Sequence, residues 1–172
     1  MPELALQLPE VHIMPGELHI ARRPAILKTV LGSCVSVTIW SARLGIGALS
    51  HGVLPLCPDG ITGPEGYRYV DFSTDYLLRQ FDAAGAHRYE LQIKVFGGAD
   101  VLPHFDRKKA TVGHQNWRTA LQTLHDQNLD ILASDLGGET GRILQFHTDS
   151  GDVFLRRLAH FNEQVEDRRH RV

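Results

Sequence analysis

The sequence of 172 residues has few cysteines, no large excess of either charge and no long hydrophobic run. Its two cysteines, Cys34 and Cys57, are too few for a disulfide framework. A net charge of -2 argues against the basic surface of a nucleic-acid-binding protein. No apolar stretch approaches the length of a membrane span, and residues 1–10 lack the pattern of a signal peptide. We therefore expect a cytoplasmic protein whose thiols are both reduced.

Recognisable metal motifs are also missing. The ten histidines are scattered, and the sequence contains neither an HExxH motif nor a CxxC pair. We therefore expect no metal and no other cofactor. Each thiol then has to be explained by packing or by its own chemistry.

The length suits one domain with a substantial hydrophobic core. Residues 162–172 are charged and have almost no apolar anchors, which is typical of a flexible, solvated tail. We expect a loose lead-in over residues 1–10, a single domain over residues 11–161, and this tail.

Strand-like stretches outnumber helical ones within the predicted domain. Alternating or buried apolar patterns predict strands over residues 18–22, 35–40, 46–54, 90–96, 131–133, 141–147 and 153–158. Helical spacing predicts one helix capped by Ser73 and ended by Gly85, and a second over residues 113–127. Residues 149–152 resemble a hairpin turn. The pattern indicates an α/β domain of the α+β kind, with a mostly antiparallel sheet covered by two helices.

Cys34 follows Gly32 and Ser33 at the start of one predicted strand, and His51 lies 17 residues later inside the next. If these strands are neighbours, the thiol and the imidazole can meet. A histidine can remove the thiol proton and later deliver it to a leaving group. A lone cysteine in a strand is more often a small buried hydrophobe, however, and a lone histidine is more often structural. The residues alone leave both interpretations open.

The residues around Cys34 and His51 resemble a known family. Residues 31–35 read LGSCV and residues 49–55 read LSHGVLP, which is similar to the chemoreceptor glutamine deamidase family, CheD. Further likenesses follow in order over residues 69–71, 94–99, 112–116, 135–142 and 148–153. The resemblance spans residues 14 to 158.

Membership would imply a layered β-sandwich of mostly antiparallel strands flanked by two main helices, similar to bacterial toxin deamidases. It implies hydrolysis of receptor glutamine side chains to glutamate through a cysteine thioester and, as in some members of the family, hydrolysis of receptor glutamyl methyl esters. It places the nucleophile at Cys34 and the general base at His51.

The family's third site residue is a threonine six residues before the cysteine, where this sequence has Lys28. Either the adjacent Thr29 takes the family threonine's role of orienting the imidazole through a local backbone adjustment, or the orienting contact is altered in this sequence. We carry the role over to Thr29, and Lys28 could instead be a solvated strand residue. We also expect the backbone near Gly32 and Ser33, with the Gly97-Gly98 turn, to bind the oxyanion or the substrate.

Two other functions remain open. The protein could be a cysteine hydrolase that acts on a different amide, or a non-catalytic adaptor that binds chemotaxis receptors or a CheC-type phosphatase. We expect receptors as protein substrates, with a CheC-type phosphatase as a further candidate partner. We expect no nucleic acid, no membrane insertion, and a monomer.

Overall fold

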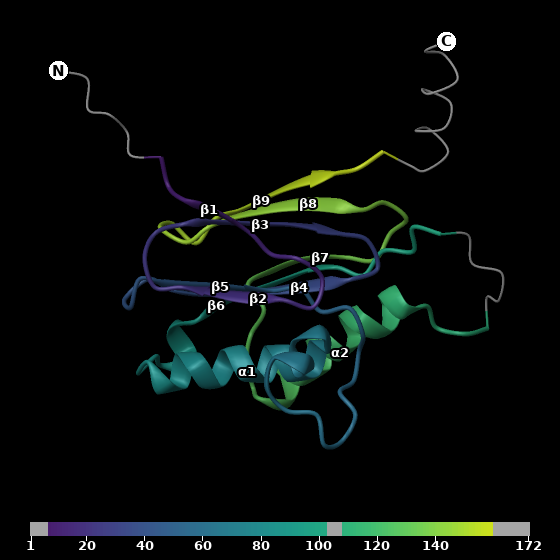
Figure 1. The fold of residues 1–172 in the computed structure, drawn as a ribbon, viewed down its shortest axis with the longest axis horizontal. Coiled ribbons are helices and arrows are strands. Elements are labelled where there is room, and N and C mark those ends of the chain that lie inside the picture. The colour runs from purple at the N-terminus through teal and green to yellow at the C-terminus, as the bar shows by residue number, and fades with distance from the viewer. Residues whose placement is uncertain (1–6, 103–107, 160–172) are drawn as a thin grey trace, which may run out of the picture.

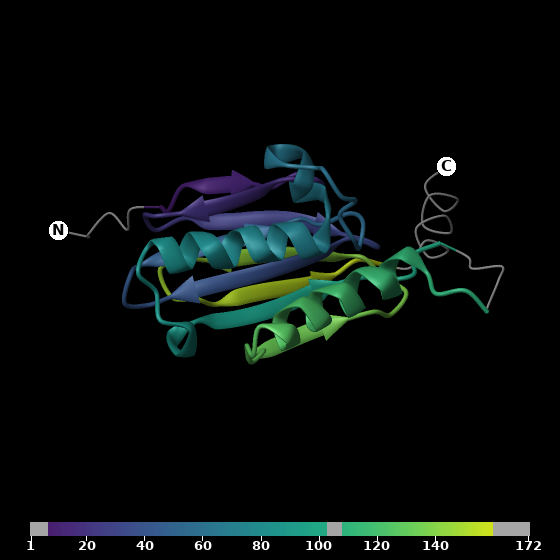
Figure 2. The ribbon, with the colours of Figure 1, turned by 90° about the horizontal axis from the view of Figure 1, so that it is seen from below.

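The computed structural model describes residues 7–102 and 108–159. Over these ranges the chain forms two stacked sheets and two main helices, and both helices lie on the outer face of one sheet (Figures 1 and 2). The expected α+β sandwich is therefore confirmed. The predicted tail at 162–172 lies outside the described residues, and β1 already begins at Glu10 within the expected lead-in.

The first sheet has four strands in the order β1-β3-β8-β9. Its strands are β1 (Glu10–His12), β3 (Ile26–Leu31), β8 (Arg142–His147) and β9 (Val153–Arg157). Only the β1–β3 pair is parallel in this sheet. The predicted hairpin between β8 and β9 is present.

The second sheet has five strands in the order β2-β5-β4-β6-β7. Its strands are β2 (Leu18–Ala21), β4 (Val35–Ser41), β5 (Ile46–Ser50), β6 (Gln92–Gly97) and β7 (Ala133–Leu136). The β6–β7 pair is parallel and the other pairs are antiparallel. The expected predominance of antiparallel pairing is therefore confirmed.

The helices are α1 (Val70–Ala83) and α2 (Val112–Asp126), and two short 3-10 helices span Gly63–Arg68 and Arg88–Glu90. The prediction that Ser73 caps the first helix is wrong. Tyr69 is the N-cap because the amide of Val70 bonds to Leu54 and fixes the start of the helix, so Ser73 lies one turn inside it. Gly85 follows the end of α1 as predicted, with a φ of +83°.

Strand β4 lies between two hydrophobic cores because its side chains alternate between the faces of the sheet. Val35, Val37 and Ile39 pack with α1 and α2 in the larger core. Trp40 points the other way and packs against the core between the two sheets. Even-numbered residues of β4 therefore face the first sheet. Cys34, which directly precedes β4, follows the same alternation and faces the first sheet as well.

Candidate active site

Cys34 and His51 lie on the same face of the second sheet. The β4–β5 pairing continues beyond β5 through Val35 and Gly52, whose backbones exchange hydrogen bonds of 2.9 and 2.8 Å. In this antiparallel register His51 lies opposite Ser36, and Cys34 is its diagonal neighbour on the same face. Diagonal neighbours are within reach of a thiol and an imidazole, so the topology brings together the two residues that the sequence singled out.

The imidazole of His51 is held from the opposite sheet by Thr29. Thr29 faces inward from β3, and its hydroxyl oxygen lies 2.7 Å from Nδ1 of His51. The same hydroxyl donates to the carbonyl of Ile13 over 2.7 Å. Because a threonine hydroxyl carries one proton, it must accept the second bond from Nδ1–H. The proton of the neutral ring is therefore on Nδ1, and Nε2 keeps its lone pair.

Nε2 of His51 is the atom that a general base would use. It is buried, and no described residue forms a hydrogen bond with it. Cys34 is only partly buried, whereas His51 is 2% exposed. The residue that carries the thiol is therefore more accessible than the residue that carries the base.

Lys28, the residue at the family's threonine position, points away from this site. Its ammonium group pairs with Glu10 at 2.7 Å on the outer side of β3. Side chains of a strand alternate between its two faces, so Thr29 and Lys28 cannot both reach the imidazole. Of the two, Thr29 is the residue that the fold places against His51.

Burial favours the uncharged forms of both reactive groups. Desolvation raises the pKa of the Cys34 thiol above its usual range. Desolvation also lowers the pKa of His51, against the smaller effects of the Ile13 carbonyl and the Glu17 charge. Both shifts favour the neutral thiol and the neutral imidazole.

The Gly97-Gly98 turn packs against the backbone of Cys34. The amide of Gly98 donates to the Cys34 carbonyl over 2.8 Å, so this amide is already engaged. Gly98 has a φ of +70°, and its carbonyl lies against Gly113 rather than facing Cys34. Cys34 and Gly98 could exchange two backbone hydrogen bonds, but only the bond from the Gly98 amide is formed. Within the described chain, the Cys34 N–H therefore has no partner.

The other expected oxyanion residues, Gly32 and Ser33, form the turn before Cys34. The Gly32 carbonyl accepts from the amide of Ala99 over 3.0 Å. The Ser33 carbonyl accepts from the side-chain amide of Asn116 over 2.9 Å. Asn116 lies in α2, and its side-chain amide also donates to the Val53 carbonyl over 2.9 Å. Its partners are remote in sequence, so no local pattern could have identified this contact.

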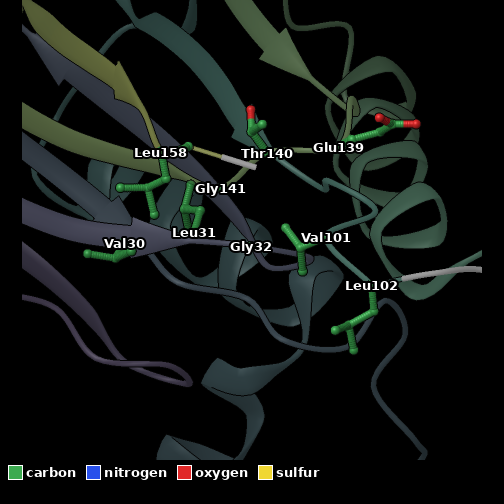
Figure 3. A pocket seen from close by; sticks show the side chains of 10 residues that line it. Val30, Leu31, Gly32, Val101, Leu102, Glu139, Thr140, Gly141 and Leu158 are labelled. Carbon is green, nitrogen blue, oxygen red and sulfur yellow. The ribbon is translucent and has the colours of Figure 1, made fainter. Parts of the chain in front are cut away.

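A pocket of about 280 Å³ opens beside the turn that precedes Cys34 (Figure 3). Its floor and walls are mostly apolar and include Val30, Leu31, Val101, Leu102 and Leu158. Gly32 forms part of its lining, two residues before Cys34. This pocket is therefore suited to aliphatic groups.

Neither a metal centre nor a membrane span is found in the described chain. Residues 7–102 and 108–159 contain no group of three or more His, Cys, Asp or Glu side chains placed to hold a metal ion. Across the same residues, no helix has both the length and the apolar character needed to cross a membrane.

Comparison with known proteins identifies the family. A family described as CheD chemotactic sensory transduction matches residues 55–157. A probable chemoreceptor glutamine deamidase CheD 2 from Geobacter sulfurreducens is 40% identical over 154 residues, covering 88% of this chain and 92% of that protein. A probable chemoreceptor glutamine deamidase CheD from Oleidesulfovibrio alaskensis is 36% identical over 166 residues, covering 94% and 78%.

A solved structure of a Bacillus licheniformis hypothetical protein, YfiH, aligns with a TM-score of 0.42 and 12% identity over 68% of this chain and 49% of that one. The predicted likeness to toxin deamidases stays a prediction. The alignments with the two relatives cover most of each relative and most of this chain. This chain therefore belongs to the CheD family.

Proposed function

We propose that this protein is a cysteine-dependent amidohydrolase that converts glutamine side chains of chemotaxis receptors to glutamate and releases ammonia. Relatives named chemoreceptor glutamine deamidase support the substrate class. The observation that carries the chemistry is the Thr29–His51 hydrogen bond of 2.7 Å, which leaves Nε2 as the basic nitrogen on the face shared with Cys34.

In the first half-reaction, Nε2 of His51 takes the thiol proton and the sulfur of Cys34 adds to the amide carbon. The resulting oxyanion is stabilised by the unpaired N–H of Cys34. The imidazolium then gives its proton to the amide nitrogen. The carbon–nitrogen bond breaks, ammonia leaves, and a thioester remains on Cys34.

In the second half-reaction, Nε2 takes a proton from water as the water oxygen adds to the thioester carbon. The carbon–sulfur bond breaks, glutamate is released, and the sulfur recovers its proton from the imidazolium. A glutamyl methyl ester would follow the same path with methanol leaving. The new carboxylate changes the charge of the receptor surface.

The contact between Thr29 and His51 supports a catalytic role over the adaptor alternative, because a hydroxyl lies against the imidazole although Lys28 pairs with Glu10 instead. A CheC-type partner, a cytoplasmic location and a monomeric state remain predictions.

Mass spectrometry of a receptor cytoplasmic fragment, together with an ammonia assay, tests the proposal. Incubation with the intact protein should convert specific glutamines to glutamates, and Cys34→Ala should abolish both signals. Cys57→Ala is the matched control because Cys57 lies elsewhere, and its thiol donates to the Pro58 carbonyl over 3.6 Å. Receptor fragments left unmodified by the folded protein would refute the receptor assignment.

A further inference from the structure

Asn116 of α2 is fully buried and contacts the backbone on both sides of the proposed active site. Its Nδ2 donates to the carbonyl of Ser33 and to the carbonyl of Val53, each over 2.9 Å. Ser33 directly precedes the nucleophile, and Val53 follows His51 by two residues. One side-chain amide therefore ties together the two segments that carry the dyad.

The contact lies where the β4–β5 ladder opens. Val35 and Gly52 exchange the last pair of backbone bonds, and beyond them the amide of Val53 bonds to the Arg68 carbonyl instead. The carbonyls of Ser33 and Val53 would otherwise have no partner at this opening. Asn116 is suited to the place because one NH₂ group can donate to two acceptors.

Fixing the Ser33 carbonyl also fixes the N–H of Cys34, because both belong to one peptide plane. In a trans peptide the carbonyl and the following N–H point in opposite directions. With the Ser33 carbonyl directed at Asn116, the Cys34 N–H points away from α2. No described residue accepts from it, since the Gly98 carbonyl is turned toward Gly113.

The acceptor side of the same amide supports a role in donation. Oδ1 of Asn116 is buried, and no described residue donates to it. A buried acceptor without a partner destabilises a fold, so packing alone would favour an apolar residue here. The two donated bonds are the feature that an apolar residue cannot supply.

We propose that Asn116 is a positioning residue that orients the Ser33–Cys34 peptide so that the Cys34 N–H receives the oxyanion. The proposal rests on the part of the proposed function that makes Cys34 the nucleophile. It does not depend on which amide or ester is the natural substrate.

Two reactions of the Cys34 thiol separate this role from a general effect on structure. With p-nitrophenyl acetate, the thiolate adds to a carbonyl, an oxyanion forms, p-nitrophenolate leaves, and Cys34 becomes acetylated. With iodoacetamide, the thiolate displaces iodide from carbon and no oxyanion forms. Both rates are measured on the full chain in a Cys57→Ser background, so that Cys34 is the only thiol, and the rates of a Cys34→Ala protein are subtracted.

Asn116→Ala should lower the ratio of the acylation rate to the alkylation rate by about tenfold or more, because an oxyanion donor contributes about a hundredfold to a thousandfold. Gln115→Ala is the matched control on the same helix. Its side-chain amide donates to the exposed Ala110 carbonyl over 2.9 Å, so its loss should leave the ratio unchanged.

An unchanged ratio in folded Asn116→Ala, or a parallel fall of both rates, would overturn the proposal. Asn116→Asp keeps the shape of the side chain and replaces the donors with a carboxylate. It takes the place of the alanine variant if that variant melts below the assay temperature. Its ratio of acylation to alkylation should also fall. Should the parent protein leave receptor fragments unmodified while the ratio still falls in the variants, the receptor assignment fails and the role of Asn116 stands.

Discussion

Thr29→Val is the substitution that most directly tests how His51 is oriented. Valine keeps the β-branched shape of threonine and suits a strand, but it lacks the hydroxyl. The change removes two contacts of 2.7 Å, one to the Ile13 carbonyl and one to Nδ1 of His51. The site is almost completely buried, with Thr29 only 4% exposed, so water cannot readily replace the hydroxyl.

The expected loss of stability is modest. A buried polar group left without a partner costs about 1–3 kcal/mol. We therefore expect Thr29→Val to lower the free energy of unfolding by about 1–2 kcal/mol. A typical domain of about 5–15 kcal/mol stays folded after such a loss.

The expected loss of activity is larger. Without the hydroxyl the ring is no longer held with Nε2 toward the thiol, so part of the contribution of general base catalysis, about a hundredfold to ten-thousandfold, is lost. We expect kcat for ammonia release from a receptor fragment to fall at least about tenfold. Urea denaturation of the same preparation checks that the protein is folded.

Thr29→Ser is the matched control because it keeps the hydroxyl and removes one methyl group. It should retain kcat within a few-fold of the parent while Thr29→Val does not. Equal kcat values for Thr29→Val and the parent, or equal losses in the serine and valine variants, would refute the argument that the hydroxyl sets the tautomer.

Three further predictions concern pH, a buried ion pair and a glycine. Because burial lowers the pKa of His51, the base stays neutral to lower pH, and the acid limb of kcat/KM should lie below about pH 6.5. The guanidinium of Arg142, which is 1% exposed, pairs with Asp135 over 2.6 Å. Arg142→Met should therefore cost about 3 kcal/mol or more in urea denaturation. Arg157→Met, at the half-exposed partner of the same carboxylate, should cost less than about 1 kcal/mol. A Cβ at Gly98 would lie 2.6 Å from the Gly113 carbonyl, so Gly98→Ala should lower the melting temperature. Gly60→Ala, with nothing within 4 Å, should lower it much less.

Each of these predictions has a result that would contradict it. An acid limb above pH 6.5 would mean that burial does not control the pKa of the base. Similar losses for Arg142→Met and Arg157→Met would mean that the buried position of Arg142 adds nothing. A melting temperature for Gly98→Ala equal to that of Gly60→Ala would mean that the close approach to α2 is relaxed at little cost.

Strand β3 shows why part of the fold was not found from the sequence. Its inward residues are Leu27, Thr29 and Leu31, whereas Val30 is 56% exposed. A buried threonine beside an exposed valine weakens the alternation on which strand prediction depends. In the second sheet, strands β4 and β6 keep a clear apolar pattern. Both were predicted within two residues of their observed bounds.

The start of α1 was misplaced for a related reason. Ser73 has the chemistry of a cap, but its hydroxyl donates to the Val70 carbonyl inside the helix. The true start is fixed by backbone bonds from Val70 and Asp71 to Leu54 and Pro55. These bonds are made by a loop that precedes the helix by more than a turn, and no local capping pattern contains that information.

The candidate site could be predicted only in part because its components come from three layers of the molecule. Cys34 and His51 lie on neighbouring strands of one sheet, which the apolar pattern around them suggested. Thr29 reaches the imidazole from the opposite sheet, and Asn116 reaches the cysteine turn from the helix layer. Contacts between layers depend on how the layers stack, which strand and helix periodicities do not specify.

The two supports act on different atoms, and this has a consequence for how the site is built. In the proposed mechanism, Thr29 acts through the imidazole and determines whether a proton can leave the sulfur. In the same proposal, Asn116 acts through a peptide plane and determines what stabilises the oxygen after the sulfur has added. Thr29 belongs to the first sheet and Asn116 belongs to α2. The second sheet lies between them and must therefore pack in a fixed position against both. The Gly97-Gly98 turn meets this need, since it lets β6 bond to the Cys34 carbonyl and approach α2 closely while leaving the Cys34 N–H free.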